Sequence, residues 1–210
     1  MAPLITREAW QQALEARCGR EAYIRLQQAK VAIIGLGGLG SNIAILLARM
    51  GVGKLHLLDF DQVELSNLHR QHYALAQVGL LKTEALAAQL RELNPWLELV
   101  VDNVKVKEDN YQELLGQDEY YCEAVDQAST KAWLINALLT TWPERYVVAA
   151  SGMAGAGSTN LLQARRISEH FYLCGDGCSD CQQESLVASR VALCAAQQAH
   201  LIYRLILGLE

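Results

Sequence analysis

The stretch Val31–Asn42, VAIIGLGGLGSN, decides the fold, because a short apolar run breaks into glycines and then reopens as a helix. A wholly apolar run of this length is typical of a strand in a parallel sheet that is covered on both faces. The glycines that follow match G-x-G-x-x-G, a loop whose backbone approaches a phosphate closely and whose helix N-terminus points at it. They are Gly35, Gly37 and Gly40, with Gly38 as an additional member. The stretch therefore predicts a nucleotide-binding strand–loop–helix unit.

Strand and helix patterns alternate along the rest of the chain. We expect strands at 31–34, 54–59, 97–101, 120–125 and 145–151, and helices at 6–29, 41–50, 83–93, 129–141 and 186–207. Segments 159–167 and 170–174 are expected to add antiparallel strands. The alternation predicts an α/β fold: a doubly wound, Rossmann-like, mostly parallel sheet with antiparallel C-terminal strands, in a single domain. We divide it into a helical arm (1–29), a nucleotide-binding core (30–150) and C-terminal strands with a helix (151–210).

Composition narrows the partners and the compartment. Of 210 residues, 51% are hydrophobic and 20% are charged, which suits one folded domain. The formal net charge of −5 and the pI of about 5.6 argue against nucleic acid as a general partner. No signal-peptide pattern is evident, and polar residues interrupt the apolar C-terminal stretch, so we expect no membrane span. Six cysteines without an export signal favour reduced thiols and a cytoplasmic protein.

An acidic residue ends the second predicted strand. Asp59 stands about 20 residues beyond the glycine loop, where dinucleotide-binding sheets place a carboxylate on the ribose. On the loop and this acid alone, a nicotinamide or flavin enzyme is favoured. Glycines used only for tight packing are the alternative.

The segment DFDQVELSNLHRQ, 59–71, adds more polar side chains than a hydride-transfer site needs. Arg70 offers a planar fork for phosphate oxygens and Asn67 can orient them, with Asp61 and Gln71 in the same loop. A solvated loop arginine is the alternative for Arg70. The segment favours a triphosphate over a dinucleotide.

Two further charged residues are expected at the same edge of the sheet. Lys82 lies near a helix start, where the helix dipole disfavours a cation unless an anion shares the site, so without a ligand we expect it to be solvated. Asp126 ends the fourth strand and can hold magnesium, although it can also cap the following helix. Because carboxyl ends of parallel strands meet at one edge, a phosphate cradle, a ribose acid, two cations and a metal carboxylate converge there. The predicted nucleotide is ATP.

These residues resemble the ThiF/MoeB/HesA superfamily, which is related to ubiquitin-activating enzymes. The motif D-F-D-x-V-x-x-S-N-L-x-R-Q is its most specific part, and the resemblance runs from about Arg17 to Leu207. Three segments are most similar to the short form of ThiF, the adenylyltransferase for the sulfur carrier ThiS: ASGMAGAGSTN (150–160), FYLCGD (171–176) and ASRVALCAAQQAHLI (188–202).

The resemblance implies ATP- and magnesium-dependent adenylation of the C-terminal Gly-Gly carboxylate of a ThiS-like carrier, releasing pyrophosphate, in thiamine (thiazole) biosynthesis. It implies that Asp59 binds ribose and that Asp126 positions magnesium. The nucleotide-binding residues implied are Gly35, Gly37, Gly38, Gly40, Asp59, Asp61, Asn67 and Gln71, and the catalytic residues implied are Arg70, Lys82, Asp126 and Arg17. A carboxylate nucleophile is already ionised, so we expect no general base.

The resemblance also implies a homodimer in which an N-terminal arginine of one subunit reaches the phosphates of the other. Arg17 is the candidate and Arg20 is the substitute. An ordinary surface arginine is the alternative.

The cysteines allow a metal or a covalent role. Larger relatives hold zinc between two C-x-x-C pairs, whereas this chain has one such pair, Cys178 and Cys181, so zinc is not favoured. In some relatives a cysteine bonds covalently to the activated carrier, and the candidates here are Cys174, Cys178 and Cys181.

The remaining cysteines and two histidines are given no chemical role. Cys18, Cys122 and Cys194 are expected in the core or as bystanders. His69 and His72 flank the arginine of the motif and are interpreted as loop residues rather than metal ligands.

Three other functions stay open. They are an adenylating enzyme of the same superfamily with another acceptor (a molybdopterin carrier or a tRNA dehydratase), a NAD-dependent oxidoreductase, and a catalytically silent half of a heterodimer. The acidic pI weighs against tRNA. Arg70 and Lys82 weigh against the oxidoreductase, and the intact phosphate-binding set weighs against the silent subunit.

Overall fold

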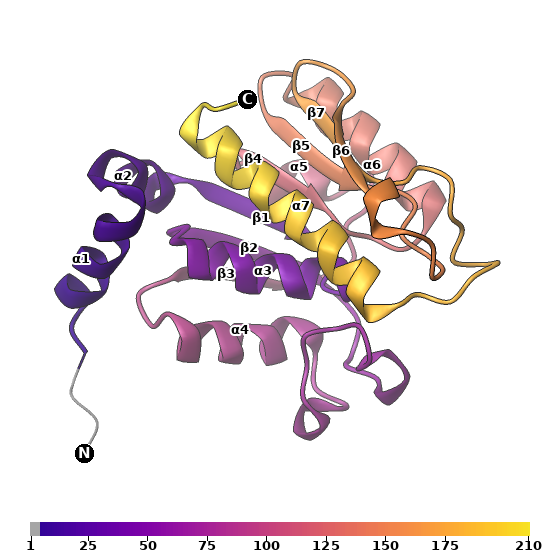
Figure 1. Cartoon of the computed structure of the whole chain (residues 1–210), viewed down its shortest axis with the longest axis horizontal. Helices are drawn as coiled ribbons and strands as arrows, with labels where there is room; N and C mark the ends of the chain where they lie inside the picture. Colours follow the sequence, from indigo (N-terminus) through magenta and orange to yellow (C-terminus); the bar gives the residue numbers. More distant parts are fainter. Residues whose placement is uncertain (1–4) are drawn as a thin grey trace.

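The computed structural model describes residues 5–210, in which seven strands form one sheet in the order β3-β2-β1-β4-β5-β7-β6 (Figure 1). The strands are β1 (Lys30–Ile34), β2 (Lys54–Asp59), β3 (Glu98–Asn103), β4 (Tyr120–Glu123), β5 (Tyr146–Ala150), β6 (Gln163–Arg166) and β7 (Phe171–Gly175). The helices are α1 (Arg7–Cys18), α2 (Arg20–Gln28), α3 (Gly38–Met50), α4 (Lys82–Leu93), α5 (Tyr111–Leu115), α6 (Ala128–Thr141) and α7 (Ala188–Leu207). Short 3₁₀ turns are η1 (Leu65–Asn67), η2 (Leu75–Gln77) and η3 (Thr159–Leu161).

The sheet is parallel except at one edge. β1 pairs in parallel with β2 on one side and with β4 on the other, so the strand order reverses there. β7 pairs in parallel with β5, and β6 pairs antiparallel with β7. The predicted fold class is confirmed, and the antiparallel pairing of the C-terminal segment is the one between β6 and β7. Ligands of such sheets bind beyond the carboxyl ends of the strands at the reversal.

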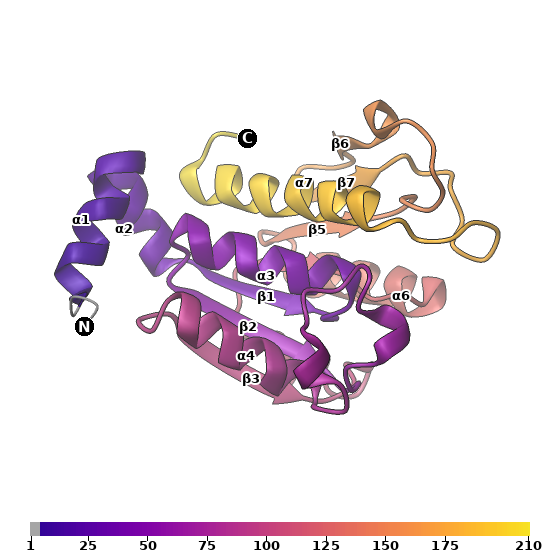
Figure 2. The same ribbon diagram turned by 60° about the horizontal axis from the view of Figure 1, so that its bottom comes forward.

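Helices cover the two faces of the sheet because successive strand residues point to opposite sides. Val31 and Ile33 of β1 are fully buried in a core that also contains side chains of α3, α4 and α7. Ala32 and Ile34 belong to a second core with side chains of α5 and α6. Figures 1 and 2 show α3 and α7 side by side on one face of the sheet. The alternation explains why the strand reads as apolar throughout.

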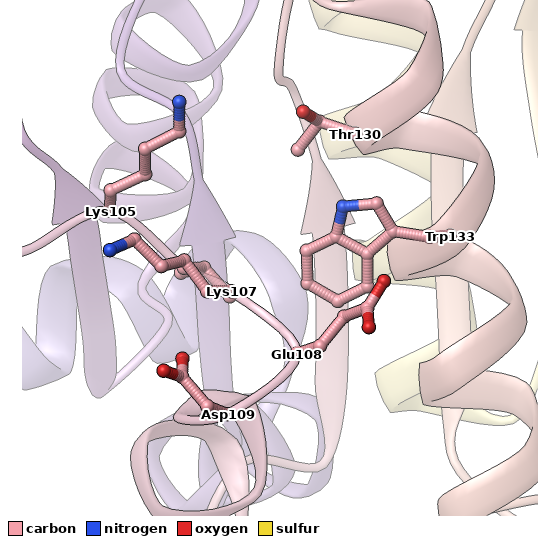
Figure 3. Close-up of a pocket in the computed structure, with 7 residues that line it drawn as sticks. Lys105, Lys107, Glu108, Asp109, Thr130 and Trp133 are labelled. Carbon is pink, nitrogen blue, oxygen red and sulfur yellow. The ribbon is translucent and has the colours of Figure 1, made fainter.

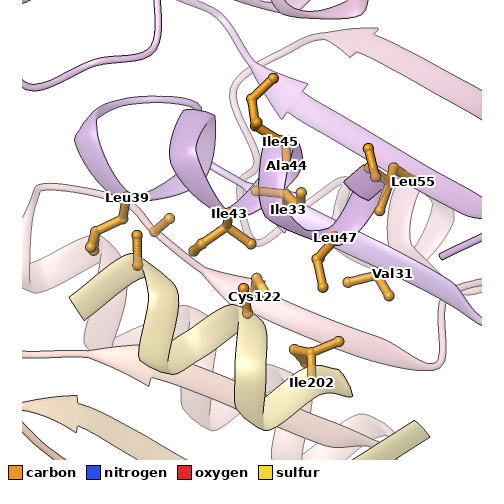
Figure 4. Close-up of a cluster of buried hydrophobic side chains, with 14 of the residues drawn as sticks. Val31, Ile33, Leu39, Ile43, Ala44, Ile45, Leu47, Leu55, Cys122 and Ile202 are labelled. Carbon is orange, nitrogen blue, oxygen red and sulfur yellow. The ribbon is translucent and has the colours of Figure 1, made fainter. Parts of the chain in front are cut away.

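The C-terminal helix α7 contributes both packing and hydrogen bonds to the larger core. Figure 4 places Cys122 of β4 close to Ile202 of this helix, and both are fully buried. Gln198 lies in the same interface and donates to the carbonyl oxygens of Glu123 and Val148, at 3.1 and 3.2 Å. No helix within residues 5–210 is long and apolar enough to cross a membrane.

The N-terminal arm consists of two helices, where the sequence pattern predicted one from 6 to 29. Gly19 lies between α1 and α2 with a φ of 85°, a conformation that favours glycine and ends α1. α2 buries Tyr23 and Leu26. Because α2 ends just before β1, the arm lies at the amino edge of the sheet, opposite the glycine loop.

Two positions in the glycine loop require glycine. Gly35 has a φ of 91°, and a Cβ there would lie 2.7 Å from the carbonyl oxygen of Ala124 on the neighbouring strand connection. A Cβ on Gly40 would collide with the carbonyl oxygen of Gly35, so this glycine lets α3 approach the end of β1. The glycines thus serve close backbone packing and, in addition, leave the N-terminus of α3 open.

Candidate functional site

A cavity of about 930 Å³ lies at the carboxyl edge of the sheet, where the strand order reverses. Its walls come from the glycine loop, the connections after β2, β3 and β4, and two C-terminal loops. The predicted site residues that line it are Gly35, Gly37, Gly38, Asp59, Asp61, Asn67, Arg70, Gln71, Lys82 and Asp126. Residues from 35 to 126 of the chain therefore meet around one space, and Gly40 lies directly behind the loop.

Asp59 fixes the shape of the glycine loop. One carboxylate oxygen accepts the N–H of Leu36 at 2.6 Å, and the other accepts the N–H groups of Phe60 and Asp61 at 2.7 and 2.8 Å. A carboxylate offers about four acceptor positions. Three are used by the backbone, which leaves capacity for about one further donor from a ligand.

Lys82 is the first residue of α4, and it is not solvated as we expected for a site without ligand. Its side chain is buried, and its Nζ donates to Asp61 Oδ2 at 2.7 Å. Asp61 is half-exposed, with 48% of its side-chain surface accessible, and so the pair opens to the cavity. The carboxylate supplies the negative charge that the helix N-terminus requires beside a cation.

Arg70 is half-buried against the glycine loop, so it is not a solvated loop arginine. A Cβ on Gly38 would lie 3.5 Å from Cγ of Arg70, which places the arginine stem against the loop. Its Nη2 donates to Asn67 Oδ1 at 2.8 Å, and Asn67 in turn donates to Glu64 at 3.2 Å. Gln71 is buried, and its Oε1 has no hydrogen-bond partner among residues 5–210.

Asp126 does not cap α6. Gln127 is the N-cap residue, and among the described residues it makes no capping hydrogen bond through its side chain. Asp126 is exposed on the cavity wall and has no hydrogen-bond or ion-pair partner within residues 5–210. In the same range, no group of three or more His, Cys, Asp and Glu side chains is placed to hold a metal ion. A single free carboxylate is compatible with magnesium, which proteins commonly hold through one or two carboxylates together with waters and substrate phosphates.

A buried ion pair below Asp126 was not predicted. Glu123 at the end of β4 is fully buried and accepts a hydrogen bond from Nζ of Lys131, which lines the cavity. Burial raises the pKa of Glu123, and the charge of Lys131 opposes that rise. The sequence signal was an acid inside an otherwise apolar strand, YYCEAV.

The end of the cavity near β2 and β3 is lined by side chains that the sequence analysis did not single out. Phe60 is 50% exposed, and Nζ of Lys105 lies 5.1 Å from the centre of its ring. A smaller hollow of about 430 Å³ adjoins this end, with Lys105 and Lys107 on one side and Thr130 and Trp133 of α6 on the other (Figure 3). Aromatic and cationic groups of this kind can flank a nucleobase.

The wall that the C-terminal loops form is held by a buried ion pair between Asp176 and Arg190. Arg190 Nη2 donates to Asp176 Oδ2 at 2.6 Å, and Nη1 donates to the carbonyl oxygen of Gly157 at 2.5 Å. Although burial opposes it, the N–H groups of Ser179 and Cys178 lower the pKa of Asp176 to about 2. The pair therefore links α7 to both C-terminal loops of the cavity wall.

The structure separates the cysteines. Cys174 was one of three candidates for a covalent role, but it is fully buried in the core and burial raises its pKa, which disfavours this candidate. Cys178 and Cys181 are exposed and line the cavity. Cys122 and Cys194 are buried as predicted, and Cys18 is half-buried.

The N-terminal arginines are not near this cavity. Arg17 lies exposed in the last turn of α1, and Arg20 begins α2, both in the arm at the amino edge. His69 and His72 are loop residues: Nδ1 of His69 lies 3.1 Å from the carbonyl oxygen of Ser66, and Nδ1 of His72 lies 3.1 Å from Oε1 of Gln89. The cavity within one chain thus forms without either arginine.

Solved structures share this fold over nearly the whole chain. The tRNA N6-threonylcarbamoyladenosine dehydratase TcdA of E. coli, in complex with ATP, superposes with a TM-score of 0.87 over 98% of each chain, at 21% sequence identity. MccB of E. coli with ATP superposes with a TM-score of 0.72, covering 96% of this chain and 62% of that one, at 20% identity. At these identities the likeness concerns the fold.

Curated proteins are similar in sequence. The adenylyltransferase and sulfurtransferase MOCS3 of Aedes aegypti is 35% identical over 126 residues, which is 60% of this chain and 29% of that protein. The adenylyltransferase and sulfurtransferase UBA4 of Saccharomyces cerevisiae is 28% identical over 207 residues, which is 95% of this chain and 46% of that protein. The chain thus spans less than half the length of these relatives. The model of the ThiF family matches residues 11–210, so the chain belongs to the ThiF family.

Proposed function

We propose that this chain uses ATP to adenylate the C-terminal carboxylate of a small carrier protein, with release of pyrophosphate. The observation that carries the proposal is the gathering of the glycine loop, Arg70, Lys82 and Asp126 around one cavity of about 930 Å³. The adenylyltransferases among the relatives and the ATP complexes of TcdA and MccB support it.

In this proposal the triphosphate lies against the glycine loop at the N-terminus of α3. Arg70 and Lys82 bind phosphate oxygens, since an ammonium group has three donors and Lys82 uses one for Asp61. The remaining acceptor capacity of Asp59 suits a ribose hydroxyl, and the exposed ring of Phe60 on the cavity wall offers a face on which the base would stack.

The residues of the chain supply placement and charge. Asp126 would hold magnesium, which offsets the charge of the phosphates when it is bound. The ionised carboxylate of the carrier needs no general base: its oxygen bonds to the α-phosphorus, and the bond from that phosphorus to pyrophosphate breaks. Arg70 and Lys82 stabilise the charge that grows on the leaving group.

The acceptor that we propose is a ThiS-like carrier with a C-terminal Gly-Gly, in thiazole synthesis in the cytoplasm. The three segments that resemble the short form of ThiF support this choice. We further propose a homodimer in which Arg17 reaches the phosphates of the partner subunit, because its exposed position on the arm leaves it available to a second copy.

A tRNA acceptor is the second candidate. The tRNA threonylcarbamoyladenosine dehydratase of Haemophilus influenzae is 34% identical over 117 residues, which is 55% of this chain and 45% of that protein. The net charge of −5 disfavours it, because affinity for nucleic acid comes largely from cations that neutralise phosphates.

Exchange of labelled pyrophosphate into ATP tests the proposal. The purified chain with magnesium is offered a ThiS-like carrier, a molybdopterin carrier, a ThiS-like carrier lacking its terminal Gly-Gly, and threonylcarbamoyladenosine-containing tRNA. We expect exchange with the intact ThiS-like carrier alone. Exchange with tRNA alone would establish the second candidate. ATP binding without exchange in any arm would rule out the proposed reaction.

A further inference from the structure

Glu123 and Lys131 flank Asp126 in the sequence and meet below it in the structure. Glu123 Oε1 accepts the N–H of Val125 at 2.8 Å, and Oε2 accepts a hydrogen bond from Nζ of Lys131 in α6. One fully buried carboxylate therefore ties the end of β4, the connection that carries Asp126, and the beginning of α6 together.

The other contacts lie at the two ends of this connection, among them the hydrogen bond that Gln198 donates to the carbonyl oxygen of Glu123 at 3.1 Å. The N–H of Ala124 donates to the carbonyl oxygen of Ile34 at 2.9 Å, and the N–H of Lys131 donates to that of Gln127 at 2.9 Å. α6 has no side-chain cap among the described residues, and the carboxylate of Asp126 has no protein partner within residues 5–210. Glu123 and Lys131 are thus among the groups that fix the backbone on both sides of Asp126.

Lys131 also lines the cavity, so direct binding of a phosphate by Lys131 is the alternative role. An ammonium group has three donors and Lys131 uses one for Glu123, whose side chain is fully buried, so a contact with phosphate would have to form without drawing Nζ away from that carboxylate. A buried carboxylate without its counter-charge is strongly unfavourable. Arg70 and Lys82, by contrast, are paired with a neutral or an exposed group, so they can shift toward a phosphate without leaving a buried charge unpaired. The geometry therefore favours an indirect role.

We propose that the Glu123–Lys131 pair is a positioning pair, which holds Asp126 in the orientation that binds the divalent cation of the bound nucleotide. The inference rests on the proposed function, because it takes the cavity to be the site of magnesium-bound ATP. It assigns no contact with substrate to either residue of the pair.

Calorimetric titration of ATP into the full chain, with magnesium and with EDTA, tests the pair. We expect Lys131→Met to weaken binding of ATP with magnesium by about 10- to 100-fold, as loss of groups that orient a metal ligand does. Binding in EDTA should stay within about twofold, and Lys131→Arg should restore the magnesium effect. Asp126→Asn should show the same loss, and combining it with Lys131→Met should add nothing. Lys54→Met, which breaks an exposed pair on the other edge of the sheet, is the matched control.

Other results would overturn the inference. Equal weakening in magnesium and in EDTA would mean that Lys131 binds phosphate itself, and additive losses in the double variant would mean that it acts independently of Asp126. If Lys131→Met fails to fold, the double variant Glu123→Gln with Lys131→Met removes both charges. It should bind ATP more weakly in magnesium and with unchanged affinity in EDTA. A wild-type chain that binds no ATP in either condition would refute the proposed function, and the inference with it. If the wild-type chain binds ATP with magnesium and the variants of Glu123 and Lys131 bind it equally well, the inference alone would be refuted.

Discussion

In two regions of the molecule a basic side chain is buried against a carboxylate, and the two regions differ in whether N–H donors remain free for a ligand. In the first, Nζ of Lys82 donates to Asp61 and retains unused N–H groups beside the cavity. The second is the His56 cluster, formed by His56, Asp102, Asp118 and Lys30. There Nδ1 of His56 lies 2.8 Å from Asp118 and Nε2 lies 2.7 Å from Asp102, so both ring nitrogens are occupied.

Exposure separates the two regions further. His56 is 2% exposed and Asp118 is 0% exposed. His56 lies on the face of the sheet that α5 and α6 cover. Asp61 is 48% exposed and faces the cavity at the carboxyl edge. The same pairing chemistry is therefore structural at His56, where both ring nitrogens are used inside the fold. It is available to a ligand where one partner stays open and donors remain.

The largest effect on stability is expected from His56→Ala. It leaves Asp118 fully buried, with only Lys30 at 3.7 Å as a counter-charge among the described residues. Loss of one partner from a buried pair costs about 3–5 kcal/mol of unfolding free energy. Urea unfolding measures this loss, and calorimetry should find ATP affinity unchanged. A loss of ATP affinity in the folded variant would break the comparison, because it would couple the cluster to the cavity.

The next effect is expected at the cavity, in activity rather than stability. Lys82→Met should lower pyrophosphate exchange by about 10²–10³-fold, or roughly 3–4 kcal/mol, as the loss of one preorganised donor to a developing charge does. Unfolding by urea should change little, because the half-exposed Asp61 is solvated when Lys82 is removed. If stability fell as far as in His56→Ala, the pair at the cavity would be structural as well.

The contrast also marks what the sequence could predict. Apolar strands and glycine positions predicted the mostly parallel sheet and the gathering of Asp59, Arg70, Lys82 and Asp126, because these features follow from local patterns and strand direction. The break at Gly19 was missed because the helical pattern of the arm continues through it. A glycine can lie inside a helix, and the pattern does not show that Gly19 adopts a positive φ.

Partners of buried charges could not be predicted. Asp61 and Lys82 are 21 positions apart, and His56 and Asp118 are 62 apart, so their contacts depend on how strands and loops are arranged in space. The sequence therefore predicted a solvated Lys82 and did not predict the ion pair of Glu123 with Lys131. Cys174 was one of three candidates for a covalent role, yet β7 places it in the core together with side chains of α7. Side-chain direction at a strand end is set by register, which the chain alone does not show.

A smaller, graded effect is expected from pH. Burial alone would lower the pKa of His56, but Asp118 and Asp102 outweigh it, and the pKa in the folded chain is raised above 6.5. A raised value means that the stabilisation is complete below the pKa of the unfolded chain and is lost as the pH rises through the folded-state pKa. Wild-type stability in urea should therefore fall as the pH increases above 6.5. His56→Gln should remove this fall in the unfolding free energy. If stability falls with pH equally in that variant, groups other than His56 cause the fall.

The smallest effect is expected from the exposed pair of Lys54 and Glu98, whose side chains are 41% and 58% exposed and 3.1 Å apart. Lys54→Met should change the unfolding free energy by less than about 1 kcal/mol, because water already solvates both charges. The difference should shrink further in high salt, which screens exposed pairs. Lys54 and His56 are two residues apart on β2, and each pairs with a carboxylate, so the main difference between the two pairs is their burial. If Lys54→Met cost as much as His56→Ala, burial would not be what separates structural from open pairs in this fold.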